Sequence, residues 1–321
     1  MIELAGAKGD VTHLAFSPDS RLVAGSGGGR GLELWDVTTA NKWGKYTGIT
    51  FHDWPITFHP TQPVCFMLAL NGLAEIETNT KKASVLHLAG QAGSYIGFPA
   101  MMPNGGGFVC HTANHLNQSG NFKRLRWTRG KPLRLVWEVK VTGPTPRALQ
   151  GLKSYIFCVM PHGKTFLTLF GKHVHRERRY LLELTHLTMH SSRDGELLQT
   201  TKLPSDTALA MATSPDSRTV VTCHNNNLCV WVAADMTGTP RQVRGNNRSQ
   251  FTAIAFHPSG KYLAATSNDA TVKLYDTTTW QVAKTFTWNI GRMRSIAFSP
   301  DGTLAAAGSD TGKVVVWDVD V

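Results

Sequence analysis

A hairpin-sized motif recurs along the chain, and this repetition constrains the fold more than any other feature. Each copy has an apolar stretch that alternates with a period of two, a turn that contains proline, and a second apolar stretch. Clear copies are VTHLAFSPDSRLVAG from Val11, FTAIAFHPSGKYLAAT from Phe251 and MRSIAFSPDGTLAAAG from Met293. This pattern predicts two antiparallel strands joined by a tight turn.

Seven copies carry a turn proline, and their spacing gives the repeat length. These prolines are Pro18, Pro60, Pro103, Pro161, Pro215, Pro258 and Pro300. The intervals are 42, 43, 58, 54, 43 and 42 residues, so two central repeats are longer than the others. The residues before the first proline and after the last one make up almost one further period. We therefore expect seven structural units of similar length.

A third strand with an aromatic end follows several of the hairpins. It occurs as LELWDVTTAN at Leu32, VKLYDTTTWQ at Val272 and VVVWDV at Val315. A fourth strand before the next copy makes each unit a four-stranded antiparallel sheet. On these motifs the chain resembles the WD-repeat (WD40) family of β-propellers over essentially its whole length. The resemblance implies an all-β fold in which residues 1–321 form a single seven-bladed β-propeller.

The last unit ends after its third strand, which predicts how it is completed. We expect Ile2, Glu3 and Leu4 to supply the missing outer strand beside residues 314–319. Closed radial sheets need such a strand because an unpaired edge would otherwise remain.

The chain departs from the family in its polar tetrads, the hydrogen-bonded side-chain networks of a typical repeat. It has no Gly-His dipeptide before a first strand. Ser309 with Trp317 and Asp269 near Tyr275 are fragments of the network, and Asn225 stands where the family has Asp. We therefore expect incomplete tetrads and a fold that depends on apolar packing.

The positive charge is concentrated in repeats three and four. The net charge is +11, and residues 121–193 contain 15 Lys and Arg against three acidic residues. The same repeats have expected insertions at about 113–124, 141–153 and 171–186. In an antiparallel meander all three lie on the face opposite the proline turns, which also holds the entries to the first strands of repeats two and seven. The residues expected to bind a partner are Lys123, Arg124, Arg126, Lys172, Arg176, Arg178, Arg179, Trp54, Trp288, Arg292 and Arg294.

Three interpretations of this basic face remain open. Basic loops can serve solubility alone, they can dock an acidic protein surface, or they can contact nucleic-acid phosphates. Trp54 and Trp288 can equally pack within the blades. The leading hypothesis is a non-catalytic interaction scaffold, a monomeric ring within a hetero-complex, with nucleic-acid binding as the alternative.

Sequence motifs that would indicate a phosphate-binding, metal-binding or catalytic site are weak. His162 to Thr165 imitates the end of a phosphate-binding loop, but it leads into a strand and not into a helix. The pairs His173/His175 and His186/His190 have ligand-like spacing without nearby Cys or carboxylate clusters. We expect no cofactor, no metal and no enzyme activity, and an enzyme site at the central channel is the least favoured alternative.

The five cysteines, Cys65, Cys110, Cys158, Cys223 and Cys229, form no C-x-x-C pair. Each lies in an apolar stretch, which is typical of reduced core side chains. The N-terminus lacks the pattern of a signal peptide, and no apolar run is long enough to span a membrane. We therefore expect a cytoplasmic protein without membrane contact.

Overall fold

The structure is a computed structural model of the chain. It describes residues 1–4, 9–28, 31–47, 55–69, 72–88, 97–113, 120–140, 153–176, 179–205, 207–245 and 249–319. Strands, turns and connections make up these residues, and no helix occurs among them. Within these ranges there is accordingly no helix of the length and hydrophobicity needed to cross a bilayer.

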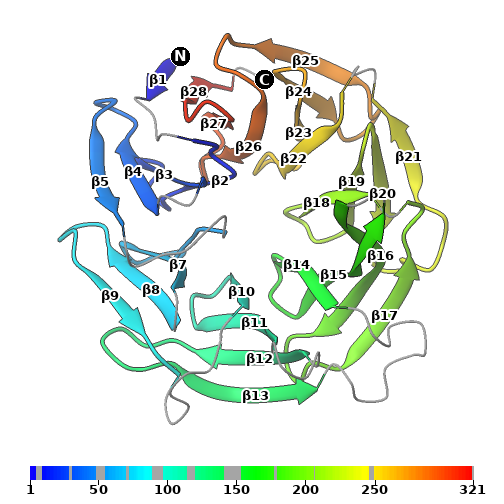
Figure 1. The fold of residues 1–321 in the computed structure, drawn as a ribbon, viewed down its shortest axis with the longest axis horizontal. Helices are drawn as coiled ribbons and strands as arrows, with labels where there is room; N and C mark the ends of the chain where they lie inside the picture. The colour runs from blue at the N-terminus through cyan, green and yellow to red at the C-terminus, as the bar shows by residue number, and fades with distance from the viewer. Residues whose placement is uncertain are drawn as a thin grey trace. The chain divides into compact units, whose positions relative to one another are not determined.

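The described strands form seven sheets of four strands each (Figure 1). Each sheet is an antiparallel meander, so the fold class is the seven-bladed β-propeller that the repeats predict. The chain divides into two compact units, residues 1–85 with 243–321 and residues 86–242. That residues 1–321 act as a single domain stays a prediction.

The first unit holds blades 1, 2, 6 and 7. Blade 1 consists of β2 (His13–Phe16), β3 (Leu22–Ser26), β4 (Leu32–Asp36) and β5 (Lys42–Tyr46). Blade 2 consists of β6 (Thr57–Phe58), β7 (Val64–Ala69), β8 (Gly72–Glu77) and β9 (Ala83–Leu86). Blade 6 consists of β22 (Phe251–Phe256), β23 (Tyr262–Ser267), β24 (Thr271–Asp276) and β25 (Val282–Thr287). Blade 7 consists of β26 (Met293–Phe298), β27 (Leu304–Ser309), β28 (Val314–Asp318) and β1 (Ile2–Leu4).

The second unit holds blades 3, 4 and 5. Blade 3 consists of β10 (Gly97–Met101), β11 (Gly107–Ala113), β12 (Gly120–Arg126) and β13 (Arg134–Lys140). Blade 4 consists of β14 (Lys153–Val159), β15 (Thr165–Arg176), β16 (Arg179–Ser191) and β17 (Leu197–Lys202). Blade 5 consists of β18 (Ala208–Thr213), β19 (Thr219–His224), β20 (Asn227–Val232) and β21 (Arg241–Arg244), and β21, like β9, crosses a unit boundary.

The N-terminal strand completes blade 7, as expected. β1 lies antiparallel to β28, with Ile2 opposite Val316 and Leu4 opposite Val314. Leu4 is fully buried in an apolar cluster that includes Trp35 of blade 1. Three residues thus join the beginning and the end of the described chain in one sheet.

A side chain at the start of the proline turns holds several of them in shape. Ser17 Oγ accepts the N–H of Leu22 at 2.8 Å and donates to Asp19 at 2.5 Å. The same two bonds recur in the turns of blades 5 and 7. In blades 2 and 6 the Nδ1 atom of His59 or His257 accepts turn N–H groups instead. A local side-chain acceptor therefore fixes the hairpin that the sequence pattern predicts.

The polar tetrads are incomplete. Trp231 Nε1 donates to Thr222 Oγ1 at 3.1 Å. The Trp317 Nε1 and Tyr275 Oη atoms are buried without a hydrogen-bond partner in the described part of the chain. The Ser309 hydroxyl lies with Thr311 and does not join Trp317. Apolar packing therefore holds these aromatic side chains, as expected.

The segment 171–186 differs from expectation. It was expected to connect the second and third strands of repeat four, but apart from the undescribed residues 177 and 178 it forms the outer parts of β15 and β16. Val174 lies opposite Leu181 and His173 lies opposite Leu182, so the strand pairing continues into the outer part of the hairpin. In repeat three, β11 ends at Ala113 and β12 begins at Gly120. The expected insertion at 141–153 lies outside the described residues up to β14.

Candidate functional site

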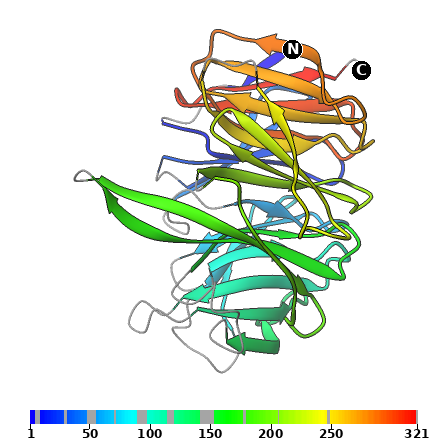
Figure 2. The ribbon, with the colours of Figure 1, turned by 90° about the vertical axis from the view of Figure 1, so that its right-hand side faces the viewer.

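The long hairpin of blade 4 carries several of the expected partner-binding residues. β15 and β16 span 12 and 13 residues, and Figure 2 shows this ribbon extending past the other strands of its blade. Lys172 lies opposite Glu183 in the pairing, and Arg176 lies opposite Arg179 at the end of the ribbon. Arg178 lies outside the described residues.

A glycine allows the hairpin to change register where it leaves the blade. The pairing shifts between Phe170 and Gly171. A Cβ atom at Gly171 would meet the Glu183 carbonyl oxygen at 2.1 Å and the Leu184 Cα at 2.8 Å. Any side chain at this position would therefore push the two strands apart.

Lys123 is not part of an exposed surface. Its side chain on β12 is only 7% exposed, and its Nζ lies 3.5 Å from a Glu138 carboxylate oxygen. Asn121 donates to the same carboxylate at 2.5 Å. A buried, paired ammonium cannot contact a partner without breaking this arrangement, so burial removes Lys123 from the expected surface.

The two arginines that follow on β12 have different surroundings. Arg124 is half-buried, and its Nη1 donates to the Ser192 carbonyl oxygen at 3.0 Å. Trp137 Nε1 donates to the same oxygen at 3.2 Å, so both side chains join blade 3 to blade 4. Arg126 is exposed. Of the three basic residues on β12, only Arg126 presents its side chain fully to solvent.

The expected residues of the first unit are partly engaged in packing. Trp288 is half-buried, with its ring centroid 4.5 Å from that of Trp317 and 5.6 Å from that of Phe286. Trp288 therefore packs against other aromatic side chains of the propeller and is not a freely exposed contact residue. Arg292 is exposed, whereas Trp54 lies outside the described residues.

Arg294 belongs to a polar cluster. Its Nη1 donates to Asn268 Oδ1 at 2.6 Å, and its other nitrogens lie 3.8 Å from an Asp10 oxygen and 3.7 Å from an Asp310 oxygen. Asp310 also accepts the backbone N–H of Arg292 at 2.9 Å. The cluster joins the approach to β2 with blades 6 and 7. Because these residues and β12 belong to different units, their common face stays a prediction.

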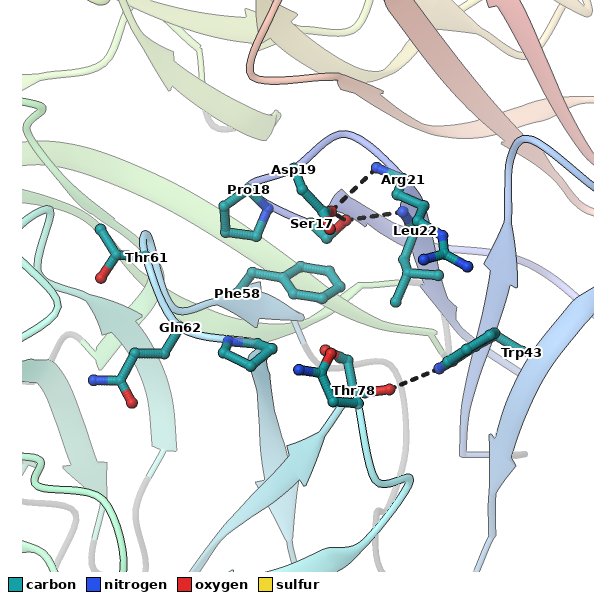
Figure 3. Close-up of a pocket in the computed structure, with 12 residues that line it drawn as sticks. Ser17, Pro18, Asp19, Arg21, Leu22, Trp43, Phe58, Thr61, Gln62 and Thr78 are labelled. Atoms are coloured by element: carbon teal, nitrogen blue, oxygen red, sulfur yellow. Dashed lines mark hydrogen bonds between the residues drawn. The ribbon is translucent and has the colours of Figure 1, made fainter.

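A groove that sequence analysis did not find lies between blades 1 and 2 (Figure 3). Its volume is about 300 Å³, and its walls are the turn from Ser17 to Leu22 and the turn from Thr61 to Pro63. Trp43 of β5 stands at one end, where its Nε1 donates to the Thr78 carbonyl oxygen at 2.8 Å. The sequence signal for it was a tryptophan between polar residues of an outer strand, as in KWGK.

Buried titratable groups in the described residues suit packing better than catalysis. Burial lowers the pKa of His190 to about 4, while its Nε2 lies 2.9 Å from the Thr188 hydroxyl and its ring stacks on Phe166. Burial raises the pKa of the Cys65, Cys110 and Cys223 thiols to about 12. A thiol that stays protonated is a poor nucleophile, and an imidazole with so low a pKa is a weak base. Across the described ranges, no three His, Cys, Asp or Glu side chains gather as a metal site would require.

Comparison with known proteins agrees with this architecture. A family model described as "WD domain, G-beta repeat" matches residues 1–36, 238–276 and 280–318, which include strands of blades 1, 6 and 7 and the strand β21 of blade 5. Over 74 residues the chain is 34% identical to "Periodic tryptophan protein 2 homolog" of Schizosaccharomyces pombe. This similarity covers 23% of the chain and 9% of that relative.

Proposed function

Because this chain is a WD-repeat β-propeller, we propose that it is a non-catalytic interaction scaffold that docks a partner protein through the basic surface of blades 3 and 4. The observation that supports this most strongly is the charge distribution. Residues 121–193 carry a net charge of +12, while the rest of the chain carries −1. Charge gathered in this way attracts an acidic partner and speeds its encounter.

The blade 4 hairpin suits such docking because its backbone extends past the other strands of its blade. The other described strands span at most seven residues, whereas β15 and β16 span 12 and 13. The sequence of its outer part, GKHVHRERRY, contains four lysine and arginine residues with aromatic and apolar neighbours. An acidic protein surface can pair with these groups at its rim while apolar side chains contribute contact area.

Charge reversal of the hairpin tests this proposal. The variant replaces Arg176, Arg178 and Arg179 by Glu in the full chain, and bound proteins are recovered from native extract in about 0.15 M and about 0.5 M salt. We expect the variant to lose the partners that the unchanged protein retains. A matched control reverses three exposed basic residues elsewhere, Arg218, Arg244 and Lys261.

Nuclease treatment separates the protein partner from a nucleic-acid partner. We expect the complex to survive nuclease, since its contacts are between proteins. Loss of all partners on nuclease treatment, with binding that falls steeply between the two salt concentrations, would indicate phosphate contacts instead. Partners that are retained equally by the hairpin variant would show that the basic hairpin is a solubility feature.

We also propose a cytoplasmic location. Support comes from the five cysteines, all of which are free thiols, four of them buried. Imaging of the tagged full chain in its own cell type, together with fractionation, tests this location.

A further inference from the structure

The groove between blades 1 and 2 is a second candidate contact surface, independent of the basic hairpin. It lies beside the proline turns in the first unit, whereas the hairpin belongs to the second unit. Figure 3 shows the two turns facing each other across the ring of Phe58. Binding in this groove would therefore be independent of binding to the basic hairpin.

The groove has an apolar base, and polar side chains stand along its walls. Phe58 and Leu22 are buried at its base, and Pro18 and Pro63 are half-buried at its sides. A second hollow of about 390 Å³ shares Pro18 and Phe58 with it and continues to Ile56 and Pro300. The two hollows together offer consecutive apolar sites, which suit an extended chain with more than one apolar side chain.

The outer end of the groove is cationic. The Arg21 guanidinium carbon lies 5.4 Å and the Lys81 Nζ lies 4.3 Å from the centroid of the Trp43 ring. Arg21 uses its Nε to pair with Asp36 at 2.9 Å, and its side chain remains 55% exposed. Among the described residues, neither the Arg21 Nη atoms nor the Lys81 Nζ makes an ion pair.

The nearby carboxylates are already engaged within the fold. Asp36 is 3% exposed and also accepts hydrogen bonds from Thr38 and Thr39. Asp19 accepts the Ser17 hydroxyl and the Arg21 backbone N–H. The donors that face outward at this end are therefore cationic, and a carboxylate complements them.

We propose that this groove binds an extended segment of a partner protein in which apolar side chains occupy the two hollows and an Asp or Glu follows at the Trp43 end. The apolar side chains fill the space over Phe58, and the carboxylate lies between Arg21 and Lys81. The cation–π contacts hold both cations near Trp43 before the segment arrives, which limits the entropy lost on binding.

Synthetic peptides on the full chain test this proposal. The probe is an array of octapeptides with two positions chosen from Leu, Phe and Trp and one Asp or Glu at varied spacing, with a second array that has Lys for the acid. The best binder is then measured by fluorescence polarisation. We expect micromolar binding for acidic peptides and at least about tenfold weaker binding for their Lys counterparts.

Variants at the cationic end locate the binding site. Lys81 has a φ of 60°, so Lys81→Asn removes the charge with a residue that tolerates this conformation. We expect about fivefold weaker binding from Lys81→Asn and tenfold or more with Arg21→Gln added. Lys82→Asn, at an adjacent exposed residue, is the matched control and keeps full affinity.

The Trp43 indole gives a readout that does not depend on affinity. Its N–H resonance, assigned with Trp43→Phe, should shift when the acidic peptide binds because the indole lies at the proposed contact. Acidic peptides that bind no better than their Lys counterparts would overturn the proposal. So would binding that leaves the Trp43 resonance and the Lys81→Asn affinity unchanged. Arg21→Gln is interpreted only if its melting temperature is close to that of the unchanged protein.

Discussion

At the scale of single residues, two equivalent turns between second and third strands contain different residues in the same unusual conformation. Ala270 in blade 6 has a φ of 64°, and Gly312 at the corresponding place in blade 7 has a φ of 85°. Both backbone N–H groups point back to the serine three residues earlier. A Cβ atom is unfavourable at such φ values, whereas glycine adopts them without strain.

Ala270→Gly should therefore stabilise the protein, by up to about 1 kcal/mol, and Gly312→Ala should destabilise it by a similar amount. Urea denaturation of both variants, followed by tryptophan fluorescence, measures the two changes. A loss of stability in Ala270→Gly would mean that the alanine methyl group packs more favourably than its backbone strain costs.

Two buried histidines make stability depend on pH. Burial lowers the pKa of both His190 and His224 from 6.5 to about 4. The unfolded chain takes up protons on these groups below about pH 6.5, while the folded chain does so only near pH 4. Their contribution to stability is therefore complete above pH 6.5 and is lost as the pH falls toward 4.

Between pH 7.5 and pH 5, each of these histidines should lower the free energy of unfolding by about 2 kcal/mol. Urea midpoints at the two pH values measure this change. In a variant with His190→Gln and His224→Gln the pH dependence should shrink, whereas His162→Gln at an exposed position should leave most of it. An unchanged pH dependence in the double variant would exclude this origin.

At the scale of elements, the contribution of β1 to stability comes mainly from one side chain. Leu4 is fully buried, while Ile2 is half-buried and Glu3 is exposed. The Glu3 carboxylate pairs with Lys313 at 2.9 Å, but both groups are about half exposed, so solvent screens the pair.

Leu4→Ala should therefore cost about 3 kcal/mol, and Glu3→Ala less than about 1 kcal/mol. Deletion of residues 1–4 should lower the melting temperature of blades throughout the first unit, because it leaves β28 as an unpaired edge. Calorimetric melting curves of the three proteins measure these effects. A deletion variant that melts like the unchanged chain would show that β1 contributes no stability.

Local chemistry explains which elements could be predicted from the sequence. Pro sets φ, Gly permits a positive φ, and a Ser hydroxyl accepts a turn N–H, so residues within each turn are enough to predict the hairpins. The role of His59 and His257 as turn acceptors was missed, since only the fold shows which imidazole nitrogen faces the turn. Burial of Lys123 was missed for a similar reason, because its position beside Glu138 depends on pairing between β12 and β13.

The groove could not be predicted because its walls come from two repeats. Arg21, Trp43 and Lys81 are each ordinary residues of a turn or an outer strand. They meet only when blade 1 packs against blade 2, and no sequence spacing records that contact. The basic hairpin was easier to find because its residues are close together in the chain.

At the scale of the whole molecule, buried thiols can report whether the two compact units open together. Cys65 lies in the first unit, and Cys110 and Cys223 lie in the second. All three are fully buried, and burial raises the pKa of each thiol to about 12, so a thiol reagent reaches them only after opening.

We predict that the chain unfolds as a single domain. Variants that retain only Cys65 or only Cys223 should then react with a thiol reagent at pH 8 with the same dependence on urea. Mass spectrometry of the modified protein measures both rates. Reaction of one thiol at a much lower urea concentration would instead show two units of independent stability.

The pairing of β1 with β28 also sets an order for events during protein synthesis. Leu4 and its partner Val314 are 310 residues apart, so at about 5–20 residues per second the ribosome needs some tens of seconds to supply the partner strand. During that time the six blades before it can form, but Ile2–Leu4 has no strand to join. Until β28 has been synthesised, Ile2 and Leu4 therefore lack the strand that covers them, and a chaperone that binds this segment would have to remain bound until blade 7 forms.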